Sequence, residues 1–419
     1  MYRVWHSSEG FANYLIANTI LKDMSNLVKT DLIASDASNG KKFHKTPDHI
    51  KNILYLDCPD IIVEKNGRPI FSIEISTEAG TGHNVFQRFA RLAASVENGI
   101  PTFYIYPKGA IVTRGKNSKW DKINPLIFKA LESMIQIYRI PVLFYYFPSD
   151  IDAYLNKPEK SPNFHKKGLR YDSGRFRDCP DSNDSEMKSL FKALNEILQL
   201  VENGSTADVI NSLESKITIR ERREFMQNEY SSLAPNNLKS WKEMSPMTST
   251  MKIQTKYLLN YIKKQLDLSD DYFDDTLLNY RDNSIIYSAN AKFRGDPYTG
   301  CLAAIDYLTS REGPTYEDRK NNIILLFGDI ELDDVNETIK FTKKTNKDIT
   351  VKDFSNKVKN SSKHNLLIND YEDLNPDQIP RYYMQVRHGS KFSKTKEIRV
   401  YAYFADIIIF PDGVFWREG

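Results

Sequence analysis

Cysteine is scarce in this chain, and its scarcity excludes two kinds of small stabilised protein. Only three cysteines occur among 419 residues, and Cys58, Cys179 and Cys301 are far apart in the sequence. Three distant thiols can form neither a disulfide framework nor a cysteine-based zinc site. We therefore expect a cytoplasmic protein, in a reducing compartment, that is stabilised by packed cores.

Long hydrophobic runs are also missing. The longest are IPVLFYYF at 140–147 and IILLF at 323–327, which are far shorter than the ~20 apolar residues of a transmembrane helix. The N-terminal residues MYRVWHSSEG lack the basic and apolar regions of a secretory signal. These absences predict no membrane partner and no export.

Several motifs that carry chemistry do not occur. The chain has no GxxxxGK[ST], no GxGxxG after a predicted strand, no HExxH and no GxSxG. Without a phosphate-binding loop, we do not expect nucleotide-driven translocation.

The chain has no large excess of charge of one sign. It carries 58 Lys and Arg against 55 Asp and Glu, a formal net charge of +3. This value neither favours nor opposes a nucleic-acid partner, because local clusters of basic residues decide such binding. The length, with 40% hydrophobic and 27% charged residues, predicts an ordinary globular protein with at least two cores.

The hydrophobic pattern of the first 150 residues predicts the order helix, hairpin, helix, strand. Helical spacing of apolar residues covers 9–28, and Asn66-Gly67 between two apolar runs predicts a tight β-hairpin. In the second strand of that hairpin, apolar and polar residues alternate, so Glu74 faces away from the apolar side. A further helix is expected at 84–98, with strands at 100–106 and 140–147.

Composition divides the rest of the chain. Residues 151–185 are rich in Pro, Asp, Ser and Lys, and this predicts a linker or a surface excursion. Residues 186–419 mix helical and strand signals, and they predict a second α/β region for DNA recognition or dimerisation. Helical signals lie at 186–229 and 254–267, and strand signals at 285–287, 323–327 and 398–410.

Two acidic residues in the hairpin suggest a metal site. Asp60 stands just before the first strand, and Glu74 lies fourteen positions later in the second. Carboxylates and backbone carbonyls are the ligands that Mg²⁺ prefers, so we expect Asp60, Glu74 and the carbonyl of Ile75 to hold one ion. Such an ion serves phosphodiester hydrolysis, and Ser76, two residues after Glu74, is where a group that orients water would be useful.

The segment CPDIIVEKNGRPIFSIEIS (58–76) resembles the PD-(D/E)XK nuclease superfamily, in particular its type II restriction endonucleases. The resemblance covers roughly residues 55–110 by motif and element order. It implies a mixed sheet flanked by helices, Mg²⁺ bound by Asp60 and Glu74, and double-stranded DNA as the substrate. In that family a Lys follows the Glu by two residues, whereas this chain has Ser76.

Because Ser76 stands where that family has Lys, the resemblance does not identify the residue that activates water. Glu78 and Gln87 are the predicted catalytic candidates beside Ser76, and His83 and Lys65 are further possibilities. Glu9, in the first predicted helix, is a candidate for an additional carboxylate. Gln87 opens a Gln-x-x-x-Arg pattern with Arg91, which resembles the helix that some branches of the superfamily place beside the site. Each of these residues has a plainer interpretation, as an exposed strand or helix side chain.

Basic residues supply the predicted DNA contacts. Arg88 and Arg91 follow the acidic motif and are expected to reach the phosphate backbone. A basic and aromatic stretch at 381–399 predicts a second contact surface, through Arg387, Lys391 and Lys394. Cutting both strands requires two active sites, so a homodimer is expected. The alternatives are a catalytically inactive DNA-binding protein with a nuclease fold and a defence nuclease activated by an effector.

Overall fold

The structure of the chain is a computed structural model. The structure describes residues 1–32, 46–54, 58–77, 82–114, 117–122, 126–149, 168–206, 208–214, 248–289, 320–326, 328–343, 406–410 and 413–416. These residues belong to two compact units. The first comprises Met1–Leu32, Asp48–Ile53 and Cys58–Met244, and the second comprises Ile33–Pro47, Leu54–Asp57 and Ser245–Gly419.

A six-stranded mixed sheet forms the centre of the first unit. Its order is β2-β1-β3-β4-β5-β8. The pairs β1–β2, β4–β5 and β5–β8 are parallel, and β3 is antiparallel to both of its neighbours. The strands are β1 (Tyr2–His6), β2 (Leu27–Asp31), β3 (Ile61–Lys65), β4 (Arg68–Ile75), β5 (Thr102–Pro107) and β8 (Val142–Phe147).

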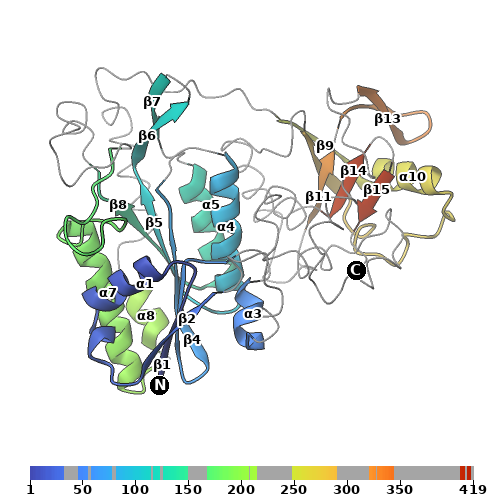
Figure 1. Cartoon of the computed structure of the whole chain (residues 1–419). Coiled ribbons are helices and arrows are strands. Elements are labelled where there is room, and N and C mark those ends of the chain that lie inside the picture. The colour runs from blue at the N-terminus through green and yellow to red at the C-terminus, as the bar shows by residue number, and fades with distance from the viewer. Residues whose placement is uncertain are drawn as a thin grey trace. The chain divides into compact units, whose positions relative to one another are not determined.

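Helices cover both faces of this sheet, as Figure 1 shows. On one side, α4 (Gly82–Glu97) and α5 (Leu126–Tyr138) pack through contacts such as Phe128 on Phe144, with ring centroids 5.0 Å apart. The other side carries α1 (Glu9–Asn18), α7 (Ser185–Glu202) and α8 (Asp208–Glu214). The expected mixed α/β sheet flanked by helices is therefore confirmed. The same part of the chain also contains four further elements: a helix α3 (Asp48–Leu54), a 3-10 turn η1 (Ile20–Asp23), and a hairpin of β6 (Gly109–Arg114) with β7 (Asn117–Lys122).

The hairpin of β3 and β4 turns where the sequence predicts. Asn66 and Gly67 both have positive φ, 52° and 81°, as a two-residue hairpin turn requires. The pairing sets Ile61 opposite Ile73 and Ile62 opposite Ser72. Asp60, just before β3, is thereby brought level with the end of β4.

The predicted helix over 9–28 is too long. Ser8 caps the start of α1, where its hydroxyl accepts the amide of Phe11 at 3.4 Å. The helix ends at Asn18, because Thr19 is extended and its hydroxyl donates to the Leu15 carbonyl at 2.9 Å. The chain then forms η1 and β2, so the end of the predicted helix is a strand that pairs with β1.

The first unit extends beyond the N-terminal domain expected at 1–150. In α7, Phe191 packs on Tyr14 of α1 with ring centroids 5.5 Å apart, and Asn195 accepts the amide of Ile20 at 2.8 Å. Residues 151–167 of the predicted linker lie outside the described part. From residue 168 the chain is held to the unit, since the Arg170 amide donates to the Pro148 carbonyl at 2.8 Å and the Cys179 thiol lies 3.8 Å from the Gly10 carbonyl.

The second unit contains a five-stranded sheet of order β15-β14-β11-β10-β9. Its members are β9 (Thr248–Gln254), β10 (Asn283–Ala289), β11 (Asn321–Leu326), β14 (Ile407–Phe410) and β15 (Gly413–Trp416), together with α10 (Thr255–Leu266) and a hairpin of β12 (Asp329–Asp333) and β13 (Thr338–Lys343). Buried Arg281 donates to Asn322 at 3.0 Å, and Asp406 accepts the amide of Ile323 at 2.8 Å. This polar network fixes the starts of β10, β11 and β14. Within the described residues of both units, no helix has the length and apolar character of a membrane span.

Candidate functional site

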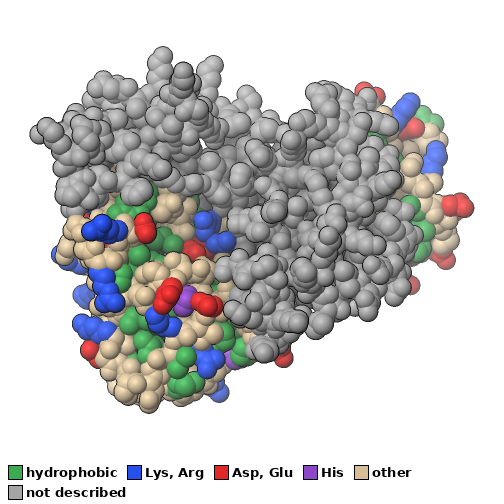
Figure 2. All heavy atoms as spheres, viewed as in Figure 1, with side chains coloured by type: hydrophobic (Ala, Val, Ile, Leu, Met, Phe, Trp, Pro, Cys, Tyr) green, Lys and Arg blue, Asp and Glu red, His purple; other side chains and the backbone are tan. Residues whose placement is uncertain are grey.

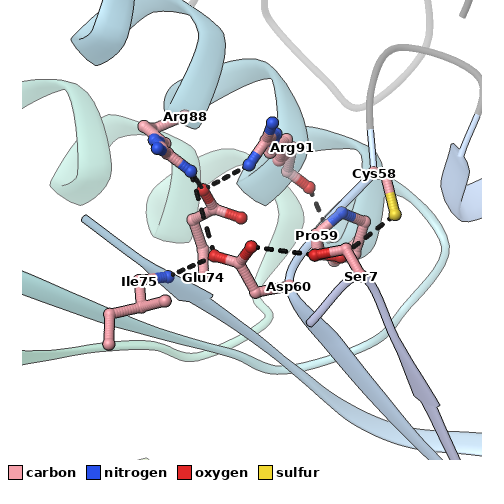
Figure 3. Close-up of polar contacts among 9 residues, drawn as sticks. Ser7, Cys58, Pro59, Asp60, Glu74, Ile75, Arg88 and Arg91 are labelled. Atoms are coloured by element: carbon pink, nitrogen blue, oxygen red, sulfur yellow. Dashed lines mark hydrogen bonds and ion pairs between the residues drawn. The ribbon is translucent and has the colours of Figure 1, made fainter. Parts of the chain in front are cut away.

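The two predicted acidic residues lie together at adjacent ends of β3 and β4. Asp60 is held by two donors: the Ser7 hydroxyl lies 3.0 Å from Oδ1, and the Ile75 amide lies 2.9 Å from Oδ2. The backbone is fixed as well, because the Ser7 amide donates to the Asp60 carbonyl at 3.0 Å. Figure 3 shows the Asp60 carboxylate between Ser7 and Ile75. Asp60 is thus positioned before any ligand binds.

Glu74 occupies the sheet face that α4 covers. Alternation along β4 places Ser72 and Glu74 on the same face. The Ser72 hydroxyl lies 2.8 Å from Ser95 of α4. Glu74 is fully buried, and its Oε1 accepts from Arg91 at 2.6 Å and from Arg88. The sequence pattern predicts that Glu74 faces away from the apolar side of β4. That face of β4 is also buried, because α4 covers it.

Burial changes the acidity of Glu74. Loss of hydration raises its pKa from 4.5 to about 7, and the Arg88 and Arg91 guanidinium groups oppose that rise. The other oxygen, Oε2, is buried and has no hydrogen-bond partner in the described part of the chain. Glu74 is consequently a carboxyl group that changes charge near neutral pH.

Arg88 links the two carboxylates. Its Nη1 contacts Glu74 Oε1 and lies 3.8 Å from Asp60 Oδ2. Although burial opposes its charge, the Glu74 and Asp60 carboxylates raise the pKa of Arg88. In Figure 3 both arginines reach the carboxylates from the same helix. When Glu74 is ionised, the four side chains carry two negative and two positive formal charges.

The donor set suits a hard divalent cation. A residue in a strand directs its N–H and C=O to the same side, and the Ile75 amide is bonded to Asp60. The Ile75 carbonyl therefore lies on the Asp60 side of β4. Two carboxylates and one carbonyl are ligands that Mg²⁺ accepts, and Glu74 Oε2 has a free acceptor position. In the described part of the chain, no three or more His, Cys, Asp or Glu side chains lie close enough together to hold a metal ion, so water or substrate would have to complete the coordination.

The remaining predicted residues have varied positions. Ser76 is buried, and its amide donates to the Ile105 carbonyl at 2.9 Å. Lys65, at the far end of β3, bonds to Glu202 at 2.8 Å, and exposed Glu9 pairs with Lys29 at 3.0 Å. The predicted residues that lie outside the described part are Glu78, the side chains of His83 and Gln87, and Arg387, Lys391 and Lys394.

Two features of the site were not expected from the sequence. Ser7 was not among the predicted site residues, and its hydroxyl donates to Asp60. Arg91 was expected at a phosphate, yet it is only 8% exposed and bound to Glu74. One signal was available, because Arg88 and Arg91 are three residues apart and so share a helix face.

The visible surface of the first unit shows no field of one sign. In Figure 2, Lys and Arg side chains alternate with Asp and Glu across the described atoms of that face. Comparisons of the chain with protein-family models, with curated protein sequences and with solved structures gave no match.

Proposed function

We propose that the first unit is a Mg²⁺-dependent endonuclease that hydrolyses double-stranded DNA, of the PD-(D/E)XK kind that residues 58–76 resemble. The observation that carries this proposal is the convergence of Asp60 and Glu74 on one point, where both contact Arg88. The element order also agrees, because a hairpin bearing both carboxylates is followed by a helix and a parallel strand.

The residues of this site would have distinct tasks. Asp60, Glu74 and the Ile75 carbonyl would hold Mg²⁺, which when bound polarises a phosphoryl oxygen and acidifies water. Ser7 and the Ile75 amide orient the Asp60 carboxylate, since both donate to it. Arg91 keeps Glu74 in place inside the interface. Ser76, Glu78 and Gln87 remain the candidates for orienting the attacking water.

The wider assembly is part of the same proposal. Two active sites are needed to cut both strands, so we propose a homodimer acting on a site of matching symmetry. The second unit would contribute recognition, with Arg387, Lys391 and Lys394 at the DNA. We further propose that the enzyme is a cytoplasmic restriction endonuclease.

The test is cleavage of a plasmid by the full chain with Mg²⁺, compared with the same reaction in EDTA. We expect discrete fragments from the wild type and none from Asp60→Asn or Glu74→Gln. The matched control is Glu214→Gln, an exposed position in α8 of the same unit, which should cleave like the wild type. Cleavage that survives both site substitutions would reject the proposal.

A second function is favoured by one specific observation. Arg88 and Arg91 already neutralise the carboxylates, and Ser76 stands where the family has Lys. Both features suit a protein that binds DNA without cutting it. Retarded migration of DNA by the wild type, with no cleavage under Mg²⁺ or Mn²⁺, would favour this binding function.

A further inference from the structure

Arg88 occupies the position that a cation bound by both carboxylates would take. One nitrogen, Nη1, contacts Glu74 and lies 3.8 Å from Asp60. The Arg88 Nε is buried without a hydrogen-bond partner in the described part. Strong arginine–carboxylate pairs are bidentate and use two parallel N–H groups. In the described part of the chain, Arg88 meets both carboxylates through Nη1, which is the kind of contact that a compact cation can reproduce.

Arg88 and Arg91 of α4 differ in how exposed their side chains are to solvent. The Arg88 side chain is 21% exposed, whereas the Arg91 side chain is 9% exposed. Arg91 lies one turn further into the interface, next to Ser95, whose hydroxyl lies 3.4 Å from the Arg91 carbonyl. Arg88 therefore has a route to solvent that Arg91 lacks.

Charge balance requires one of the arginines to move when a metal binds. The ionised site is formally neutral, and a divalent cation would raise it to plus two in a buried place. Uncompensated buried charge is costly. If Arg88 leaves the carboxylates, the formal charge of Asp60, Glu74, Arg91 and the metal together is plus one. One phosphodiester group brings the charge of that set to zero.

We propose that Arg88 is an internal counter-ion of the Asp60–Glu74 pair, which a divalent cation displaces and which then contacts a DNA phosphate. This inference rests on the proposed metal site. It assigns Arg88 a positioning role with two states, one on the carboxylates and one on the substrate. The carboxylates stay preorganised in the first state, since Arg88 prevents their mutual repulsion.

The test measures Mn²⁺ binding to the full chain by electron paramagnetic resonance, without DNA. Arg88→Met removes the competing charge and keeps an unbranched apolar stem, so we expect the Kd for Mn²⁺ to fall about tenfold or more, within the usual range of coupling. The matched control is Arg68→Met at the other end of β4, about 20 Å away by strand rise, which should bind like the wild type. Asp60→Asn should abolish binding in each background.

Binding by Arg88→Met that is equal to or weaker than that of the wild type would overturn the inference. Absence of Mn²⁺ binding to both proteins would overturn it together with the metal site. Should Arg88→Met not fold, labelling of wild-type arginines with a dicarbonyl reagent decides the question. Mass spectrometry should show greater labelling of Arg88 in Mn²⁺ than in EDTA, with Arg91 protected in both, and unchanged labelling of Arg88 would contradict the proposed displacement.

The two proposals fail in different ways. Tighter Mn²⁺ binding by Arg88→Met, with no plasmid cleavage by the wild type, would keep the counter-ion role and reject the endonuclease. Plasmid cleavage by the wild type, with unchanged Mn²⁺ binding in Arg88→Met, would keep the endonuclease and reject the counter-ion role.

Discussion

Replacing Glu74 by glutamine should change how the stability of the first unit depends on pH. As the pH rises from acid to alkaline, the unfolding free energy of the variant should increase relative to that of the wild type. Glutamine has the shape of the protonated carboxyl group but cannot ionise. In the folded wild type, burial raises the pKa of Glu74 from 4.5 to about 7. The folded state therefore keeps a proton, between these values, that the unfolded chain has lost.

The sign and size of the effect follow from that proton. The wild type has its full stability below the unfolded pKa, and it loses the Glu74 contribution as the pH rises through the folded pKa. A shift from 4.5 to about 7 corresponds to roughly 3 kcal/mol, at about 1.4 kcal/mol per unit. Glu74→Gln has no such loss. The difference in unfolding free energy should thus move by roughly 2–3 kcal/mol in favour of the variant between pH 5 and pH 8.

Urea unfolding in EDTA at pH 5, 6, 7 and 8 tests this expectation. Pulsed hydrogen exchange with mass spectrometry of peptides from β4 and β5 reports on the first unit alone, which matters because a chain of two units need not unfold in one step. Glu214→Gln is the control and should follow the wild type at every pH. If the variant instead loses stability relative to the wild type as the pH rises, attraction to Arg88 and Arg91 outweighs burial, and the reasoning is refuted.

Three further substitutions probe the fold that holds the site. Phe144→Ala should lower the unfolding free energy by about 3–5 kcal/mol, because this ring is 1% exposed; a cost near 1 kcal/mol in urea unfolding would show that the cavity closes. Gly67→Ala should cost about 1 kcal/mol, since φ is 81° there, and an unchanged urea midpoint would count against the turn assignment. Ser72→Ala removes a hydroxyl lying 2.8 Å from Ser95 and 2.9 Å from Thr102; we expect a loss of about 1–3 kcal/mol, and a stabilised variant in thermal melts would contradict it.

Local signals in the sequence were sufficient for the hairpin and for much of α4. The Asn66-Gly67 turn was predictable because few residues accept positive φ at two successive positions. In α4, Phe89, Leu92 and Val96 are buried, as their spacing predicts. In the second unit, the predicted strand at 285–287 lies inside β10, and residues 323–326 of the strand predicted at 323–327 lie inside β11.

Contacts between elements could not be predicted from these local sequence patterns. Strand β1 has a short mixed sequence, YRVWH, and its strand character depends on pairing with β2 and β3. The partners of Glu74 depend on which helix covers its face, and alternation along β4 does not reveal that. For the same reason Arg91 was assigned to DNA, although its position in the structure is against Glu74.

The spacing of contacts between α4 and β4 has a consequence for how this site can change. Ser95 meets Ser72 and Arg91 meets Glu74, so four residues of helix match two residues of strand. These steps are about 6 Å and about 7 Å long, since the rise per residue is about 1.5 Å in a helix and about 3.3 Å in a strand. A single inserted or deleted residue in either element would break this correspondence, and would separate the acidic residues from the arginines while also unpairing the serines. Variation in length should therefore be tolerated between the end of β4 and the start of α4. It should not be tolerated between Ser72 and Glu74 or between Arg91 and Ser95.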